Sequence, residues 1–223
     1  MTTRMFLIRH GSTTLTAEDR FAGSTDVPLG PDGFKQAERL AARLAGESIA
    51  AVYCSPMRRT IDTATVATRS FGLTPVTRDG LREMNHGRWE GLRRSEVEAL
   101  YRDEYAAWEI DPFTFAPEGG ESGLDVMARA LPEIRSIVDA HPGENVVVVS
   151  HKATIRLMIS SLLGFDPRGY RDRLDQAPAC VNVLDFKGPV RARLMLFNDI
   201  SHYAGQVSRA EHKLSKVWDT TRA

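Results

Sequence analysis

The chain has 223 residues, of which 42% are hydrophobic and 26% charged, and its 29 Lys and Arg residues balance 29 Asp and Glu residues. This composition is typical of a folded globular protein and excludes disorder as the main state. Because the formal net charge is zero, no global field attracts a nucleic-acid backbone or an anionic membrane, and we expect neither as a partner.

The sequence carries no targeting or disulfide signal. No stretch approaches the ~18 consecutive apolar residues of a membrane span, and the apolar run at 5–8 is too short for a signal peptide. The two cysteines, Cys54 and Cys180, are too few for a disulfide framework and lack the paired spacing of a zinc site. We therefore expect a reducing, cytoplasmic location.

Short apolar runs alternate with helical patterns along the chain. The runs predict buried strands, and four consecutive valines suit a strand that is covered on both faces. Apolar residues at helical spacing predict the helices. In chain order, the predicted elements are a strand at 4–9, a helix at 31–44, a strand at 49–54, a helical stretch after Ser55-Pro56 that ends near residue 71, a strand at 145–150, a helix at 154–163, and strands at 181–186 and 191–197 on either side of a Gly188-Pro189 turn.

The alternation of strands and helices predicts an α/β fold with three α/β/α layers and a mostly parallel central sheet, because right-handed crossovers place helices on both faces. No repeat or linker divides the chain, so we expect a single domain over residues 1–223. Ligands of such folds bind at the carboxyl ends of the strands. Three polar clusters, at 9–11, 55–59 and 150–151, fall in the loops at these ends.

The first of these clusters has the composition of a phosphate site. Arg9 offers a planar fork of donors for phosphate oxygens, Gly11 allows the backbone to approach closely, and the hydroxyl residues that follow can donate to the remaining oxygens. The imidazole of His10 is then placed to attack phosphorus. Taken alone, His10 has the alternative interpretation of a loop histidine without a special role.

Three further ionisable residues belong to candidate loops. His151 follows the valine strand, Arg59 begins the helix after Ser55-Pro56, and Glu83 lies in the segment 81–91. Singly, they have ordinary interpretations as a buried structural histidine, a surface arginine and a solvated carboxylate. Together with Arg9 and His10, they predict a cationic pocket with an acid, which stabilises phosphoryl transfer without a metal ion.

Six ordered motifs stand out over residues 4–160: RHGST at 9–13, the segment 20–37, SPMRRTIDTA at 55–64, LREMNHGRWEG at 81–91, GGES at 119–122 and VVVVSHKATIR at 146–156. Together they resemble the histidine phosphatase superfamily, the family of cofactor-dependent phosphoglycerate mutases and their phosphatase relatives. The resemblance implies a phosphoglycerate mutase-like fold with a small helical cap insertion at about 88–121. A lone RHG triplet is a weak signal, whereas ordered motifs at family-like spacing are highly specific.

The resemblance also implies the roles of the candidate residues. It makes His10 the phosphorylated nucleophile and Glu83 the proton donor, and it builds the phosphate pocket from Arg9, Arg59 and His151. It implies neither a metal nor a cofactor. The implied substrate-binding residues are Thr16, Ala22, Gly23 and His86.

The sequence departs from the family pattern at three positions near the pocket. Ser12 stands where a glutamate or glutamine is common, and Thr16 stands where an asparagine often helps to bind phosphate. Lys152 follows the second histidine where glycine is frequent. These changes affect the details of the pocket more than its chemistry.

The acceptor of the phosphoryl group separates a phosphatase from a mutase. In the phosphoglycerate mutases, an arginine after the catalytic glutamate binds the substrate carboxylate, whereas Met84 stands at that position here and cannot do so. The mutases' pair of adjacent arginines also has no clear equivalent in 105–121. We therefore predict a metal-independent phosphatase of a small-molecule phosphate monoester, with a mutase-type phosphotransferase as the alternative.

The identity of the ester stays open between phosphoserine-type and sugar or glycerate phosphate-type substrates. The pattern at 83–87 looks like that of metal-independent phosphoserine phosphatases, in which the histidine at the position of His86 faces the substrate, and a loop histidine beside Trp89 is the alternative. His202 contacts substrate or lies at the surface. The aromatic residues of the cap line the substrate site or pack the cap; they are Trp89, Tyr101, Tyr105, Trp108, Phe113 and Phe115.

Two further questions concern catalysis and assembly. A noncatalytic relative that binds a phospho-ligand or a protein is another alternative, but binding alone requires neither a nucleophile such as His10 nor a proton donor such as Glu83. A homodimer also stays open.

Overall fold

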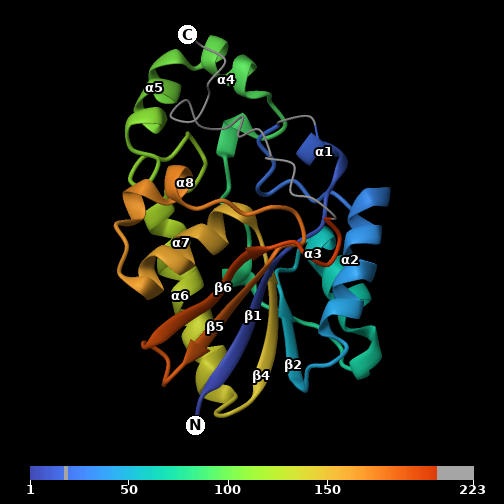
Figure 1. Ribbon diagram of the computed structural model, residues 1–223. Coiled ribbons are helices and arrows are strands. Elements are labelled where there is room, and N and C mark those ends of the chain that lie inside the picture. The colour runs from blue at the N-terminus through green and yellow to red at the C-terminus, as the bar shows by residue number, and fades with distance from the viewer. Residues whose placement is uncertain (18–19, 205–223) are drawn as a thin grey trace.

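The computed structural model describes residues 1–17 and 20–204, without the side chains of residues 16 and 17 (Figure 1). Strands and helices alternate along it, as predicted. The strands are β1 (Thr3–Arg9), β2 (Ile49–Cys54), β3 (Val76–Thr77), β4 (Asn145–Ser150), β5 (Val181–Phe186) and β6 (Ala192–Asp199). The α-helices are α1 (Thr14–Ala17), α2 (Pro31–Leu44), α3 (Arg58–Thr68), α4 (Arg94–Leu100), α5 (Arg102–Ile110), α6 (Gly123–Ala140), α7 (Lys152–Leu163) and α8 (Tyr170–Arg173). The 3-10 helices are η1 (Arg69–Phe71), η2 (Asp79–Leu81), η3 (Gly87–Trp89) and η4 (Pro167–Gly169).

The six strands of the described chain form one sheet in the order β3-β2-β4-β1-β5-β6. The first four in this order run parallel, whereas β5 is antiparallel to both of its neighbours. The predicted α/β fold with a mostly parallel sheet is therefore confirmed. The predicted strand at 191–197 lies one residue early at its start and two residues short of the end of β6.

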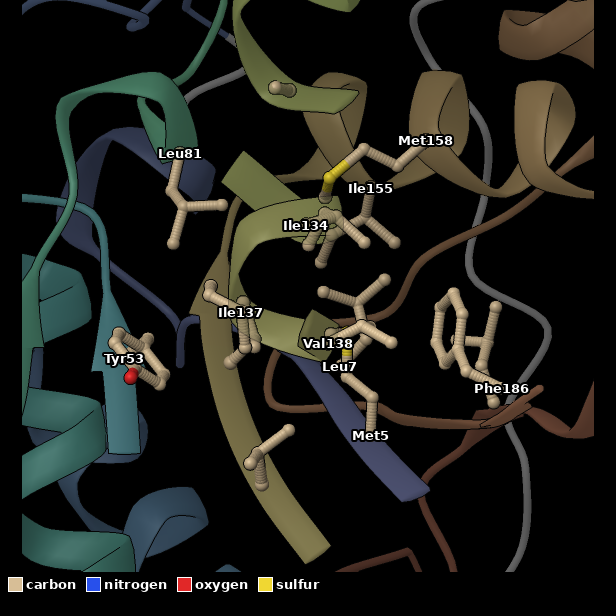
Figure 2. Close-up of a cluster of buried hydrophobic side chains, with 14 of the residues drawn as sticks. Met5, Leu7, Tyr53, Leu81, Ile134, Ile137, Val138, Ile155, Met158 and Phe186 are labelled. Carbon is tan, nitrogen blue, oxygen red and sulfur yellow. The ribbon is translucent and has the colours of Figure 1, made fainter. Parts of the chain in front are cut away.

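Both faces of the sheet are buried, and successive side chains alternate between them. On one face, Met5 and Leu7 of β1 belong to a cluster with residues of α6 and α7 (Figure 2). On the other face, Phe6 and Ile8 pack with residues of α2 and α3. Because a strand has a side-chain period of two, one apolar run supplies both cores. The helices thus form the two outer layers of the predicted three-layer architecture.

The sequence analysis did not predict α6. Its signals are present, because Val126, Ala130, Ile134 and Ile137 are buried at helical spacing. A capping box starts the helix: the hydroxyl of Ser122 accepts a hydrogen bond from the backbone N–H three residues later at 3.2 Å. Its buried residues pack on one face of the sheet.

Within the described ranges, no helix is long and apolar enough to cross a membrane.

The segment 88–121, the predicted cap, carries α4 and α5 beyond the carboxyl end of the sheet (Figure 1). These helices pack around a cluster in which Trp89, Tyr105 and Trp108 are buried together with Phe21. The rings of Trp89 and Trp108 meet edge to face with centroids 5.9 Å apart. Of the two interpretations of the cap aromatics, packing inside the cap accounts for Trp89, Tyr105 and Trp108.

Replacing Leu7 with alanine tests whether the core between the sheet and α6 stabilises the fold. Leu7 is fully buried, so Leu7→Ala is expected to lower the free energy of unfolding by about 2–5 kcal/mol. Urea denaturation measures this loss. Leu100→Ala is the matched control, because Leu100 is 64% exposed, and equal losses for the two variants would contradict the assigned core.

Candidate active site

The carboxyl ends of the parallel strands bring all five predicted catalytic residues to one edge of the sheet. Arg9 ends β1 and His10 follows it, while His151 follows β4. Arg59 lies in the first turn of α3, after β2, and Glu83 follows η2. The rings of the two histidines are in edge contact, with centroids 5.2 Å apart. Segments that are distant in sequence therefore meet where the loops of such a sheet gather.

His10 is buried and held in one tautomer. Its Nδ1 lies 2.7 Å from the carbonyl oxygen of Gly11, and because a carbonyl can only accept, Nδ1 carries the proton. Burial, followed by the charges of Arg59 and Arg9, lowers the pKa of His10 well below its usual value. The neutral ring therefore presents the lone pair of Nε2, as a nucleophilic imidazole must.

His151 presents a hydrogen-bond donor to the same site. Arg59 Nε donates to His151 Nδ1 at 3.2 Å, so the neutral ring carries its proton on Nε2. Burial is the largest cause that lowers the pKa of His151, and Arg59 adds to it. Nε2 is buried and has no hydrogen-bond partner among the described residues. It can donate to an oxyanion placed beside His10.

Backbone carbonyls, rather than carboxylates, hold the two arginines in place. Arg59 donates to the carbonyl oxygens of Gly23 and Thr25, each at 2.9 Å, and Arg9 donates to that of Gln176 at 2.6 Å. The buried Nε of Arg9 has no partner in the described part of the chain. Because carbonyls orient a guanidinium without cancelling its full charge, both arginines remain able to bind phosphate.

Glu83 is bound to the N-terminus of α7. Its carboxylate accepts hydrogen bonds from the backbone N–H groups of Ala153, Thr154 and Met84 at 3.0–3.1 Å. The hydroxyl of Thr154 donates to it at 3.1 Å. The positive end of the helix dipole also favours a carboxylate here. Glu83 is thus fixed beside His151, the residue that precedes the helix.

Sequence reasoning missed Glu90, which holds the loop that positions Arg59. Its carboxylate accepts from the backbone N–H groups of Gly23, Ser24, Thr25 and His86 at 3.0–3.2 Å. These donors, with the hydroxyl of Thr25, lower the pKa of Glu90 against the opposing effect of burial. Its place in the segment 81–91 was the only available signal, because its partners Gly23, Ser24 and Thr25 lie 65–67 residues away in sequence.

The four predicted substrate-binding residues have different surroundings. The side chain of Thr16 lies outside the described part of the structure, and Ala22 is half-buried. Gly23 uses its backbone N–H for Glu90 and its carbonyl for Arg59. A Cβ on this glycine would lie 1.7 Å from the carbonyl oxygen of Met84, so the close approach of these two loops requires glycine.

His86 lies beside the aromatic cluster of the cap. Its ring meets Phe21 edge to face at 4.9 Å, and its buried Nδ1 has no hydrogen-bond partner among the described residues. Burial lowers its pKa. His202, the other histidine with two interpretations, is half-buried, and its ring meets that of Tyr203 edge to face at 4.9 Å. Among the described residues, the ring contacts of His86 and His202 are with Phe21 and Tyr203 rather than with His10 or His151. Both interpretations of each histidine therefore stay open.

This arrangement is suited to phosphoryl transfer. The neutral imidazole of His10 lies close to the charges of Arg59 and Arg9 and against the ring of His151, whose Nε2–H has no partner among the described residues, and Glu83 is held at the N-terminus of α7. Fixed donors of this kind stabilise the charge on the transferring oxygens. Among the described residues, no group of three or more His, Cys, Asp or Glu side chains could hold a metal ion.

Known proteins are similar to this chain in both sequence and fold. Residues 5–200 match the family model of the histidine phosphatase superfamily (branch 1). Phosphoserine phosphatase 1 of Hydrogenobacter thermophilus is 32% identical over 163 residues, which cover 73% of this chain and 77% of that protein. The bifunctional protein Rv2228c of Mycobacterium tuberculosis is 32% identical over 90% of this chain, which spans only 55% of its length. The solved structure of the mycobacterial glucosyl-3-phosphoglycerate phosphatase Rv2419c aligns with a TM-score of 0.80 and 28% identity, covering 89% of this chain and 99% of that chain.

The contacts of Glu90 predict a loss of anion affinity when its charge is removed. Glu90→Gln places an amide NH₂ among backbone donors, which loosens the 23–25 loop and moves Arg59. We expect the affinity for inorganic phosphate to fall about tenfold or more, since hydrogen bonds to charged groups contribute about 1.5–3 kcal/mol. Isothermal titration calorimetry measures the change. Glu38→Gln on the exposed side of α2 is the control, and an unchanged phosphate affinity in Glu90→Gln would refute the positioning role.

Proposed function

Because this chain belongs to the histidine phosphatase superfamily (branch 1), we propose that it hydrolyses a small-molecule phosphate monoester through a phosphohistidine intermediate on His10. The observation that carries the proposal is the state of His10. Its Nδ1–H is bound to Gly11, its pKa is lowered by burial and two arginines, and its Nε2 lone pair is available beside the phosphate pocket.

The first chemical step transfers the phosphoryl group to the enzyme. His10 Nε2 attacks phosphorus as the ester P–O bond breaks, and Arg9, Arg59 and His151 stabilise the equatorial oxygens. Glu83 gives a proton to the departing alkoxide. This step requires the protonated form of the carboxyl group, as general acid catalysis does.

The second step returns the enzyme to its starting state. Water attacks the phosphohistidine, its proton passes to the ionised Glu83, and the P–N bond breaks to release inorganic phosphate. The carboxylate that the α7 N-terminus holds in place is ready for this role as a base. No metal ion is required in either step, because fixed cationic donors supply the electrostatic stabilisation.

The surroundings of Met84 favour water, rather than a second substrate hydroxyl, as the acceptor. Met84 is 2% exposed and packs with Phe113 and Leu157. It therefore offers no cation for a mutase-type substrate carboxylate at the position after Glu83. The names of relatives also support a phosphatase, since they include phosphoserine phosphatase and glucosyl-3-phosphoglycerate phosphatase.

We also propose the domain organisation, the cellular location and the partners of the protein. Residues 1–223 form a single histidine phosphatase domain with residues 88–121 as its cap, and the enzyme works in the cytoplasm without a nucleic-acid or membrane partner. Thr16, Ala22, Gly23 and His86 remain predicted substrate-binding residues. A homodimer and the noncatalytic alternative have no observation that favours them.

The covalent step predicts where phosphate can be trapped. Rapid acid-free quenching during turnover of p-nitrophenyl phosphate should leave acid-labile phosphate on His10, and His10→Ala should abolish both the adduct and turnover. A metal chelator should leave the rate unchanged. Phosphate bound to another residue, or full loss of activity with the chelator, would exclude this mechanism.

The proton-donor role of Glu83 predicts a dependence on the leaving group. Glu83→Gln should slow hydrolysis of an alkyl phosphate by about 10²–10⁴-fold, because general acid catalysis contributes about this much when the leaving group is a poor one. The nitrophenyl ester should lose much less in its first step, since phenolate leaves without protonation. Burst-phase kinetics separate this step from hydrolysis of the intermediate. Equal losses in the first step for both esters would assign Glu83 to positioning instead.

A further inference from the structure

A second cluster of cations adjoins the phosphate pocket on the α7 side. Lys152 and Arg156 stand one helical turn apart on α7, and both approach the same carboxylate oxygen. Asp175 Oδ1 is 3.3 Å from Arg156 Nη2 and 3.7 Å from Lys152 Nζ. One carboxylate therefore faces two cations, and the cluster retains positive charge.

Backbone contacts tie this cluster to the catalytic residues on two sides. Ala153, the residue after Lys152, donates its N–H to Glu83 Oε2 at 3.1 Å. Gln176, the residue after Asp175, accepts from Arg9 at 2.6 Å. Lys152 also follows His151 directly, and neighbouring Cα atoms are only about 3.8 Å apart. The charge of Arg9 also lowers the pKa values of Lys152 and Arg156, which places the cluster within electrostatic range of the site at His10.

The two cations are incompletely compensated by the described residues. The Arg156 side chain is only 6% exposed, and its buried Nε has no hydrogen-bond partner among these residues. Lys152 retains 25% exposure of its side chain. Burial, with the charges of Arg156 and Arg9, nevertheless lowers the pKa of Lys152 to about 7, against the opposing effect of Asp175. An anion arriving from solvent would relieve this repulsion.

We propose that Lys152, with Arg156 behind it, binds a carboxylate of the substrate while the phosphate occupies the pocket at His10. This inference rests on the proposed phosphatase function and defines the substrate as a short phosphate ester of a carboxylic acid. A bound anion favours the protonated form of Lys152, and the two cations with Asp175 then leave one surplus positive charge, which fits a monoanion. Asp175 positions the ammonium and guanidinium groups rather than contacting the substrate.

Two substrates that differ only in this group test the proposal. In glycerol 3-phosphate a hydroxymethyl group replaces the carboxylate of 3-phosphoglycerate. The wild-type enzyme should prefer 3-phosphoglycerate in kcat/KM, and Lys152→Met should raise KM for that substrate about 10- to 100-fold, as expected for a charge-assisted hydrogen bond. KM for glycerol 3-phosphate should change little, and Lys152→Arg should retain most of the preference.

Two controls separate this proposal from other outcomes. Lys35→Met removes an exposed lysine that also pairs with an aspartate, Asp32 at 3.2 Å, and should leave both KM values unchanged. Hydrolysis of p-nitrophenyl phosphate reports the phosphatase function itself, and its absence in the wild type would overturn that function. If this ester is hydrolysed but the wild type shows no carboxylate preference, or if Lys152→Met affects both natural esters equally, the carboxylate site is wrong and Lys152 forms only a structural ion pair.

Discussion

The pairing of β1 with β4 is the constraint on which the rest of the site depends. In its register Arg9 lies opposite Ser150, so the next residues, His10 and His151, leave neighbouring strands at the same edge of the sheet. Their edge contact follows from this register. β2 is the other neighbour of β4, and the helix after it delivers Arg59 to His151. The strand order, which burial of both sheet faces stabilises, thus sets the geometry of the pocket.

Uncompensated positive charge is the second property of this edge. Arg9 and Arg59 are buried, yet their described hydrogen bonds run to carbonyl oxygens and to His151 rather than to carboxylates. Burying such charges is costly, and the apolar cores on both sheet faces offset the cost. Burial lowers the pKa values of His10 and His151, and the same charges add to this effect, so both rings are neutral. In the proposed mechanism, one electrostatic arrangement therefore prepares both the nucleophile and the site for a phosphoryl dianion.

Carboxylates around the pocket have different roles because different groups surround them. Glu90 is enclosed by backbone N–H groups and stays ionised as a structural anion that fixes the loop of Arg59. Glu121 accepts from Arg129 and from the backbone N–H of Asn85, while Arg129 also donates to the carbonyl of Glu83. These contacts hold the Glu83 segment against α6 and α7. Glu83 accepts from backbone N–H groups at the N-terminus of α7, directly after His151 in the chain, and in the proposed mechanism it exchanges protons.

The sequence by itself determined the layers of the fold and the candidate catalytic set, because period-two strands, helix spacing and donor-rich strand ends are local patterns. It identified Arg9, His10, Arg59, Glu83 and His151 through motifs whose order matched a known family, although it missed α6 despite its cap and spacing. Only the tertiary structure decided which partners these residues have. The links from Glu90 to residues 23–25 and from Lys152 to Asp175 join segments far apart in sequence. Such contacts depend on the register of the strands and on the crossovers between them, and the local sequence patterns used for prediction specify neither.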